Sequence, residues 1–307
     1  MDDRDQVLVS VIAISYNHAS YIQAALDSIF SQSYKAIEII IVDDASTDDS
    51  AAIIQQCIAG TAIQFIKNEL NSGNCKSFNK AFVLSKGKYI IDFALDDLMY
   101  PDRIAKQVSV LEKNEERVGV CFSNVDIIDT ESKYIKTHYP SFYHRLSASP
   151  IPEGNVFEAL LSRYYINPVS MMFRRTVIES LNGYDETLAY EDFDFWIRSS
   201  RTFQYVYIPE VLSAKRIVPT SLSGLFYKEH QEHMFESTLG VCKKAWWLCK
   251  TNEEKRALML RCRYEAKQAL RFNYASVVKE YLKILKTIDP KFYLYNSIVR
   301  SILFFKT

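Results

Sequence analysis

"VLVSVIAISYNHASYIQAALDSIFSQSYKAIEIIIV", residues 7–42, is the stretch of the sequence that decides the fold. It begins with an apolar run over residues 7–14, and residues 20–32 then carry apolar side chains at helical spacing. A second apolar run covers residues 37–42. A strand, a helix and a further strand in this order predict a βαβ unit, in which the two strands run parallel.

The alternation of strands and helices continues after this unit. We expect a helix over residues 48–58, a strand over 62–66, a helix over 75–85 and strands over 89–95 and 118–125. Such an order predicts an α/β fold with a mostly parallel, Rossmann-like sheet covered by helices on both faces. In sheets of this kind ligands bind beyond the carboxyl ends of the strands.

The order of elements loosens in the second half of the chain. Residues 126–152 predict a long loop, residues 168–175 a strand that leads into a helix, and residues 190–200 a helix with an acidic first turn. From residue 240 onward the pattern is helical. We therefore divide the chain into an α/β domain, residues 1–239, and a helical region, residues 240–307.

Charge separates these two parts of a chain of 307 residues with a formal net charge of zero. Residues 240–307 hold 15 Lys and Arg against 5 Asp and Glu, whereas residues 1–239 hold 22 against 32. The basic and aromatic helices of the second part suit contact with an anionic membrane surface, or packing on the first part or on a partner subunit. The acidic first part and the lack of a recognition motif predict no nucleic-acid binding.

The cysteines and the amino terminus bear on the compartment. Six cysteines lie far apart without a CxxC pair, which favours reduced thiols and indicates no zinc site. The first residues lack the apolar segment of a signal peptide, and no run reaches the ~18 apolar residues of a membrane span. We expect a cytoplasmic protein, peripheral at the inner membrane face if the basic helices meet lipid.

Polar segments follow several predicted strands, at residues 15–18, 43–50, 68–74 and 96–97. Their side chains suit phosphate, ribose, a base or a metal ion. The last segment is the acid pair Asp96 and Asp97, directly after an apolar strand. Adjacent carboxylates near a core disfavour their own ionisation, so they need solvent, hydrogen-bond donors or a cation.

Three segments resemble, in order, the signatures of one enzyme family. They are "VSVIAISYNHASYIQAALDSIFSQSYKAIEIIIVDDASTD" (residues 9–48), "SGNCKSFNKAFVLSKGKYIIDFALDD" (72–97) and "NGYDETLAYEDFDFWIR" (182–198). The sequence is similar to the family 2 glycosyltransferases with the GT-A fold over residues 7–225. The resemblance implies transfer of a sugar, with inversion, from a nucleotide-diphosphate donor such as a UDP-sugar to a glycan or lipid-linked glycan acceptor, as in the synthesis of bacterial surface polysaccharide.

The resemblance also assigns a nucleotide site. Asp44 is the better candidate to accept the N3 proton of uracil, with Asp43 beside it, and helix capping is the alternative for Asp43. Ile14, Tyr16 and Asn17 end the first strand, where the family contacts the base and the ribose. Tyr16 can stack on a base or pack at the sheet edge.

A second group of donor contacts follows the third and fourth strands. Gly73 and Asn74 lie in a loop that suits close approach of the donor, or forms a simple turn. Most relatives carry Asp-x-Asp-Asp before the following helix, and Ala94 replaces the first acid here, so we expect other groups to hold the ribose. By resemblance Asp96 also contacts the nucleotide, and Asp96 and Asp97 bind Mn²⁺ or Mg²⁺; a turn with an Asx cap is the alternative.

The third signature implies the catalytic base. An inverting transfer needs a base within reach of the acceptor hydroxyl. By resemblance Asp192 takes that role and Glu191 supports it or binds the acceptor; an acidic first helical turn is the alternative. Val218 stands where many relatives carry histidine, which leaves Arg216 as a candidate diphosphate contact. Asp92, an isolated acid inside a strand, receives no role.

Two other functions remain open. A nucleotidyltransferase shares the chemistry of the donor, but the basic, glycine-rich phosphate loop expected near its amino terminus is missing from the sequence. A catalytically silent protein that binds a nucleotide sugar or a glycan would explain Ala94 and Val218. The intact acid centres favour the transferase.

Overall fold

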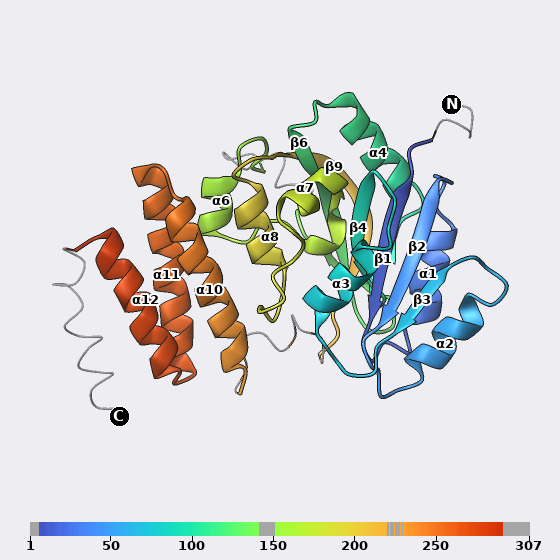
Figure 1. Ribbon diagram of the computed structural model, residues 1–307, viewed down its shortest axis with the longest axis horizontal. Coiled ribbons are helices and arrows are strands. Elements are labelled where there is room, and N and C mark those ends of the chain that lie inside the picture. The colour runs from blue at the N-terminus through green and yellow to red at the C-terminus, as the bar shows by residue number, and fades with distance from the viewer. Residues whose placement is uncertain are drawn as a thin grey trace.

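The computed structural model describes residues 6–140, 151–219 and 230–290, together with residues 221, 224 and 228. Within this part of the chain the centre is a nine-stranded sheet (Figure 1). Its strands are β1 (Val9–Ser15), β2 (Ile37–Asp43), β3 (Gln64–Lys67), β4 (Tyr89–Ala94), β5 (Leu98–Met99), β6 (Val118–Ile128), β7 (Tyr134–Thr137), β8 (Met172–Arg174) and β9 (Gln204–Arg216).

Helices connect and cover these strands. Those of the first half are α1 (Ile22–Phe30), α2 (Ser50–Cys57), α3 (Asn74–Phe82) and α4 (Arg103–Lys113). The second half holds α6 (Phe157–Ser162), the 3-10 turn η2 (Pro168–Ser170), α7 (Arg175–Ser180), α8 (Asp192–Ser199), α10 (Glu232–Leu248), α11 (Asn252–Arg271) and α12 (Ala275–Ile288).

The sheet order is β3-β2-β1-β4-β8-β6-β9-β5, with β7 paired to β6. β3, β2, β1 and β4 run parallel, which confirms the predicted α/β fold and the βαβ unit of residues 7–42. β8 joins this block to β6 by antiparallel pairing on both sides. The order places β1 and β4 in the interior of the sheet, so their carboxyl ends open onto its middle.

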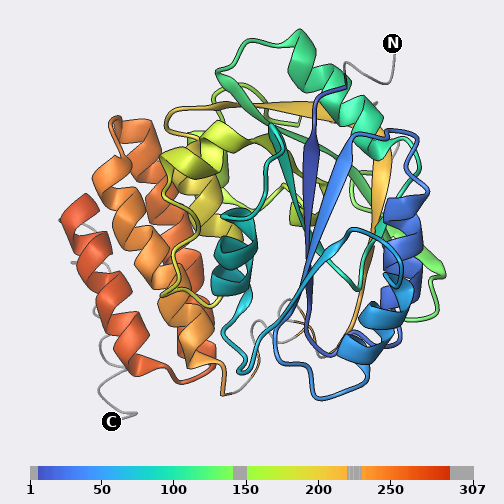
Figure 2. The same cartoon turned by 45° about the vertical axis from the view of Figure 1, so that its right-hand side comes forward.

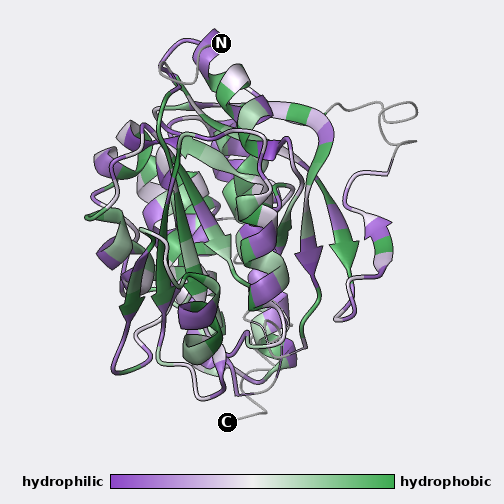
Figure 3. Ribbon diagram, turned by 90° about the vertical axis from the view of Figure 1, so that its right-hand side faces the viewer, coloured by the Kyte–Doolittle hydropathy of each residue, from purple (hydrophilic) through white to green (hydrophobic). Residues whose placement is uncertain are grey.

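Alternation along the strands builds a core on each face of the sheet. Val9, Val11 and Ala13 pack on one face against α1, α2 and α4, whereas Ile12 and Ile14 pack on the other against α3 and the elements that follow it. Figure 3 shows the resulting apolar strands at the centre of the molecule. A strand buried on both faces reads as the continuous apolar run found in the sequence.

The last three described helices pack side by side, with α11 against α6, α10 against α8, and α12 against α10 and α11 (Figures 1 and 2). Their buried residues, including Leu258, Cys262 and Tyr281, share one core with Phe193 of α8 and Phe157 of α6. This packing accords with one of the alternatives given for the helical region, and contact with a membrane surface stays a prediction. None of the helices among the described residues has both the length and the apolar character that crossing a membrane requires.

Several segments differ from expectation. The predicted strand over residues 168–175 is the turn η2 followed by the three-residue β8, because Pro168 cannot donate to a sheet ladder. β7 lies inside residues 126–152, where we expected a loop, while residues 141–150 fall outside the described part. The sequence pattern missed β9 and α6, and α10 begins at Glu232, before the helical region expected from residue 240.

Candidate functional site

The carboxyl ends of β1, β2 and β4 lie next to one another. The register pairs Ser15 of β1 with Asp43 of β2, and Ile14 with Ala94 of β4. The polar segments that follow these strands therefore meet at one edge of the sheet, as predicted for an open parallel sheet.

The carboxylate of Asp44 holds the loop between β3 and α3. Its Oδ1 accepts hydrogen bonds from the amide of Asn68 at 2.8 Å and from the backbone N–H and hydroxyl of Ser72, both at 3.0 Å. Its Oδ2 accepts from the backbone N–H of Gly73 at 2.8 Å. Burial raises the pKa of Asp44, but hydrogen bonds led by that of Ser72 outweigh it and lower the pKa below its usual value.

Asp43 and Asn17 fix the loop that follows β2. Asp43 is fully buried, and its carboxylate accepts from the backbone N–H of Ser46 at 3.1 Å and from its hydroxyl at 2.5 Å. Asn17, at a φ of +56°, donates its N–H to the Ser46 hydroxyl at 2.9 Å and accepts from the N–H of Thr47 at 2.8 Å. Both side chains thus shape a turn.

Tyr16 and Ile14 present different groups to this edge. The side chain of Tyr16 is 43% exposed, so a planar ligand can stack on it. Ile14 is buried in the core, and its carbonyl accepts from the N–H of Leu95 at 2.9 Å. Of these two side chains, only that of Tyr16 faces the solvent.

The acid pair after β4 is tied to the end of β9. Asp97 Oδ1 accepts from the backbone N–H of Arg216 at 2.8 Å, and Arg216 Nε donates to the carbonyl of Asp96 at 2.8 Å. Arg216 also donates to the carbonyl of Asp129 at 2.9 Å and stacks over the Tyr21 ring, 4.8 Å from its centre. The guanidinium that the sequence offered for the diphosphate therefore holds the Asp96–Asp97 turn.

Both acids of this pair are buried, each 6% exposed. Burial, and then the neighbouring Asp96 carboxylate, raise the pKa of Asp97 well above its usual value. His18 lies on the other side, with Nε2 3.9 Å from Asp96 Oδ2 and with a buried Nδ1 that has no hydrogen-bond partner. We did not expect a role for His18 from the sequence, although it lies in the same polar segment as Tyr16.

The second acid centre lies at the start of α8. Glu191 Oε2 accepts from the side-chain amide of Asn74 at 2.7 Å, which joins α8 to the start of α3. Asp192 Oδ1 is buried and has no hydrogen-bond partner. Burial, and then the charge and hydrogen bond of Glu191, raise the pKa of Asp192 well above its usual value. A carboxylate whose pKa is raised in this way is suited to act as a general base.

Lys215 of β9 acts on both acid centres. After the larger effects of burial and neighbouring acids, its ammonium acts to lower the pKa of both Asp97 and Asp192. We did not expect a role for Lys215 from the sequence, because a single lysine near the end of a strand carries no signal of its own.

The pair Asp96 and Asp97 fits a divalent cation. Two adjacent, buried carboxylates repel each other, and a hard cation relieves that repulsion while Mg²⁺ and Mn²⁺ accept one or two carboxylates. Within the described residues no group of three or more His, Cys, Asp or Glu could hold a metal ion. Phosphate oxygens and water would therefore have to complete the coordination.

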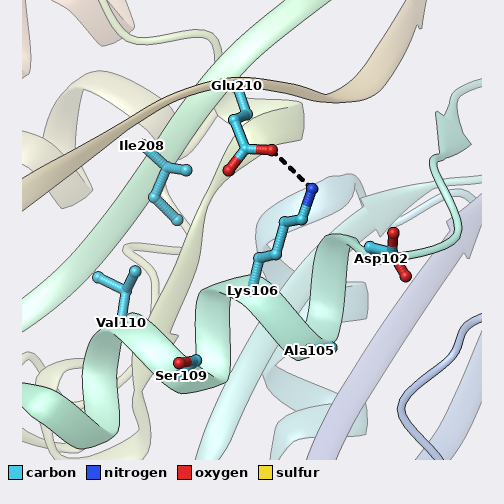
Figure 4. A pocket seen from close by; sticks show the side chains of 7 residues that line it. All are labelled: Asp102, Ala105, Lys106, Ser109, Val110, Ile208 and Glu210. Carbon is cyan, nitrogen blue, oxygen red and sulfur yellow. Dashed lines mark hydrogen bonds and ion pairs between the residues drawn. The ribbon is translucent and has the colours of Figure 1, made fainter.

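A shallow hollow of about 380 Å³ lies elsewhere, between α4 and β9 (Figure 4). Lys106 and Glu210 form an ion pair across it, with Lys106 Nζ 2.6 Å from Glu210 Oε2. None of the candidate site residues lines it.

Comparison with known proteins now identifies the family. The model of glycosyl transferase family 2 matches residues 10–181, more than half of the chain. The chain belongs to this family.

Curated relatives of this family 2 glycosyltransferase are glycosyltransferases without an assigned reaction. One from Rickettsia prowazekii is 29% identical over 235 residues, which cover 76% of this chain and 71% of that protein. One from Methanocaldococcus jannaschii is 30% identical over 224 residues, 70% of this chain and 72% of that protein. The protein is accordingly an enzyme that transfers sugars.

Solved structures place the transferase in the GT-A fold. The 1–349 segment of S. aureus TarS in complex with UDP has a TM-score of 0.67 at 15% identity, covering 92% of this chain and 82% of that one. The mannosyltransferase PcManGT from Pyrobaculum calidifontis, in complex with GDP-Man and Mn²⁺, has a TM-score of 0.62 at 18% identity, covering 93% and 76%. At these identities the similarity concerns the fold.

Proposed function

We propose that this glycosyltransferase moves a sugar from a nucleotide-diphosphate donor, a UDP-sugar, to an acceptor hydroxyl with inversion. The observation that carries the proposal is the link between two groups of acids: the Gly73 N–H donates to Asp44 at the carboxyl end of β2, and the next residue, Asn74, donates to Glu191 beside Asp192. The Asp96–Asp97 pair follows β4, which lies beside β1 at the same edge of the sheet. Neighbours of the same fold bind UDP, UDP-GlcNAc, and GDP-Man with Mn²⁺, which supports a nucleotide-sugar donor.

Asp192 is the proposed base. Because its pKa is raised, the Asp192 carboxylate binds a proton more strongly than an ordinary aspartate. It can therefore take the proton of an acceptor hydroxyl as that oxygen attacks the sugar. Glu191, held by Asn74, supports Asp192 from the adjacent position. A base on the face opposite the departing diphosphate gives inversion in one displacement.

Asp96 and Asp97 would hold Mn²⁺ or Mg²⁺. When bound there, such an ion neutralises the negative charge that develops on the departing diphosphate. Asp97 already accepts the Arg216 N–H through Oδ1, whereas the Asp96 carboxylate faces His18. Asp96 is therefore the carboxylate we assign to direct contact with the ion.

The nucleotide would lie over the ends of β1 and β2. Tyr16 offers a stacking surface, and Asp44 Oδ2, which accepts the Gly73 N–H, is the oxygen we assign to the N3 proton of uracil. Asp43, Asn17 and Ile14 shape the walls behind them. Because Ala94 has no acid to offer, other groups must hold the ribose.

The remaining assignments extend this proposal. The acceptor is a glycan or lipid-linked glycan of bacterial surface polysaccharide synthesis, and the protein works in the cytoplasm, at the inner membrane face if its basic helices meet lipid. We assign the catalytic chemistry to residues 1–239 and a helical region to residues 240–307, whose described helices pack on α6 and α8 through α11 and α10.

Incubation with a panel of UDP-sugars and Mn²⁺, with and without EDTA, tests the proposal. We expect UDP release that EDTA abolishes, and a thermal shift by the active donor, since a ligand of the native state stabilises it. Asp192→Asn should abolish transfer and leave UDP binding intact. Full activity of that variant would contradict the role of Asp192 as the base. Turnover unaffected by EDTA would contradict the role of the metal ion, and binding of UDP without turnover of any donor would contradict the assignment as an active transferase.

A further inference from the structure

Asp92 lies in the middle of β4, an interior strand of the sheet, where an apolar side chain would cost less free energy to bury. The hydroxyl of Tyr184 donates to its Oδ2 at 3.1 Å. Burial, and then the charge of Glu191, raise the pKa of Asp92 well above its usual value, while hydrogen bonds from Tyr184 and Asn74 act in the opposite direction. The Asp92 carboxylate thus lies within the influence of the Glu191 charge, although burial and that charge both disfavour its ionised form.

The amide of Asn74 stands between the two carboxylates. Its nitrogen donates to Glu191 Oε2 at 2.7 Å. The Asn74 side chain is also, after Tyr184, the second hydrogen-bonding group that acts to lower the pKa of Asp92. A side-chain amide has two N–H groups, so it can serve one carboxylate with each. Rotation of the amide would break both bonds, which means that Asp92 fixes the amide and the amide fixes Glu191.

Both donors to Asp92 are anchored to α3. Asn74 is the first residue of that helix. Tyr184 donates its N–H to Asn79 Oδ1 and accepts from Asn79 Nδ2 at its carbonyl, both at 2.9 Å, and its ring centre lies 4.2 Å from that of Phe78. The orientation of the Glu191 carboxylate therefore rests on a helix packed in the core.

We propose that Asn74 and Asp92 are positioning residues, which orient Glu191 and thereby hold Asp192 in the direction from which it meets the acceptor. This inference rests on the proposed role of Asp192 as the base. A carboxylate pair without such support could rotate apart, and a displacement of about 1 Å at a reacting group can cost about 100-fold in rate.

A double-mutant cycle in steady-state kinetics tests the arrangement. Asn74→Ala and Asp92→Asn should each lower kcat about 10–100-fold and leave the KM for the donor nearly unchanged. The double variant should be no slower than the slower single variant, because both act through one amide. Asn252→Ala, an exposed asparagine at the start of α11 and outside the candidate site, is the matched control and should retain the wild-type kcat.

Additive losses in the cycle, or kcat values equal to wild type, would overturn the proposal. So would losses that merely follow the fraction of unfolded protein, measured by thermal melting of each variant. Asp92→Asn is suited to this comparison because an amide oxygen still accepts the hydrogen bond of Tyr184.

A carboxyl ¹³C titration needs no turnover and separates this inference from the proposed function. The Asp192 signal is assigned by its loss in Asp192→Asn, and Asp92→Asn should lower the pKa it reports because a negative neighbour is removed. The other titratable and charged groups facing Asp192 are Cys75, Asp92, Tyr184, Glu191 and Lys215. An unchanged titration would overturn the positioning, whereas failure of every donor in the wild type would overturn only the transfer.

Discussion

At the scale of single residues, acids that look alike in the sequence have different partners in the structure. Asp44 is saturated by its own loop at Oδ1, Asp43 caps a turn, and Asp97 accepts a backbone N–H. Asp96 lies beside a histidine. Carboxylates that already accept protein hydrogen bonds stabilise the fold, and the one without such bonds is the more available to a ligand.

Substitutions of Asp96 and Asp97 should therefore have different effects on the free energy of unfolding. Asp97→Ala leaves the buried N–H of Arg216 unsatisfied and should lower the free energy of unfolding by about 1–3 kcal/mol. Asp96→Ala removes a like charge and should leave that free energy unchanged or higher, while transfer is lost. Urea unfolding beside initial rates measures both, and equal destabilisation by the two changes would contradict the assignment.

Asp44 should make the stability depend on pH. Its pKa is lower in the folded protein than the value of about 3.9 in an unfolded chain, so its contribution is complete above that value and is lost as the pH falls through the folded pKa. At pH 7 Asp44→Asn should cost about 1.5–3 kcal/mol, because an amide cannot accept the Gly73 N–H through its nitrogen. Urea unfolding at pH 7 and pH 3 should show this difference shrinking with acid; a constant difference would argue against it.

The sequence located the acids of the site and not their partners. Asp96, Asp97, Glu191 and Asp192 follow motifs whose order is readable in one dimension. Asp92 was left aside because one acid within an apolar run carries no sign of the strand's place in the sheet. Only the pairing of β4 with β1 and β8 shows that it is interior.

At the scale of elements, the start of α3 joins two parts of the site. Gly73 donates to Asp44, and the next residue, Asn74, donates to Glu191. Gly73 has φ +86° and ψ 162°, a conformation essentially restricted to glycine. The conformational freedom of this glycine is what lets one short segment reach both carboxylates.

Gly73→Ala should disturb both ends of that segment. No heavy atom lies within 4 Å of the added Cβ, so the cost is backbone strain of about 1–3 kcal/mol. We expect weaker UDP binding together with a lower kcat, measured by calorimetry and initial rates. Gly60→Ala is a control with positive φ and open space far from the site in sequence; it should share the loss of stability and retain both activities.

Elements with a strong period were predictable, and mixed ones were not. β1, α1 and β2 appear within two residues of their expected limits, because a buried strand and an amphipathic helix each leave a clear pattern. β9 carries Pro209, Glu210 and Lys215 among its apolar residues, and its register with β6 is irregular. β8 has three residues, too few to show any period.

At the scale of the whole molecule, an ion pair joins the last helices to the catalytic elements. Lys244 of α10 lies 2.5 Å from Asp185 Oδ2 and 2.6 Å from Asp194 Oδ1 of α8. Asp194 is 1% exposed and also pairs with Arg198. In the acidic first turn of α8, Asp194 thus serves assembly, next to Asp192, the proposed base.

Lys244→Met should weaken this assembly. It keeps the apolar stem but leaves the buried Asp194 with one cation fewer, and should lower the free energy of unfolding by about 1–3 kcal/mol, since the lysine is itself partly exposed. Lys243→Met is the matched control, because Lys243 pairs with Glu280 at the surface and should cost less than about 1 kcal/mol. Equal losses of unfolding free energy in the two variants, measured with urea, would contradict the larger contribution assigned to Lys244.

The core shared by α6, α8 and the last three helices is completed only late in translation, because its parts lie far apart in the sequence. α8 ends at Ser199, whereas α12, which completes the cover, ends at Ile288. At ~5–20 residues per second, translation takes roughly 5–20 seconds to proceed from the end of α8 to the end of α12. Until then, the core that α6 and α8 share with the last helices is incomplete. During that interval a nascent chain is a target for chaperones and a partner for its own copies, so the yield of active enzyme should rise when translation is faster or chaperones are abundant.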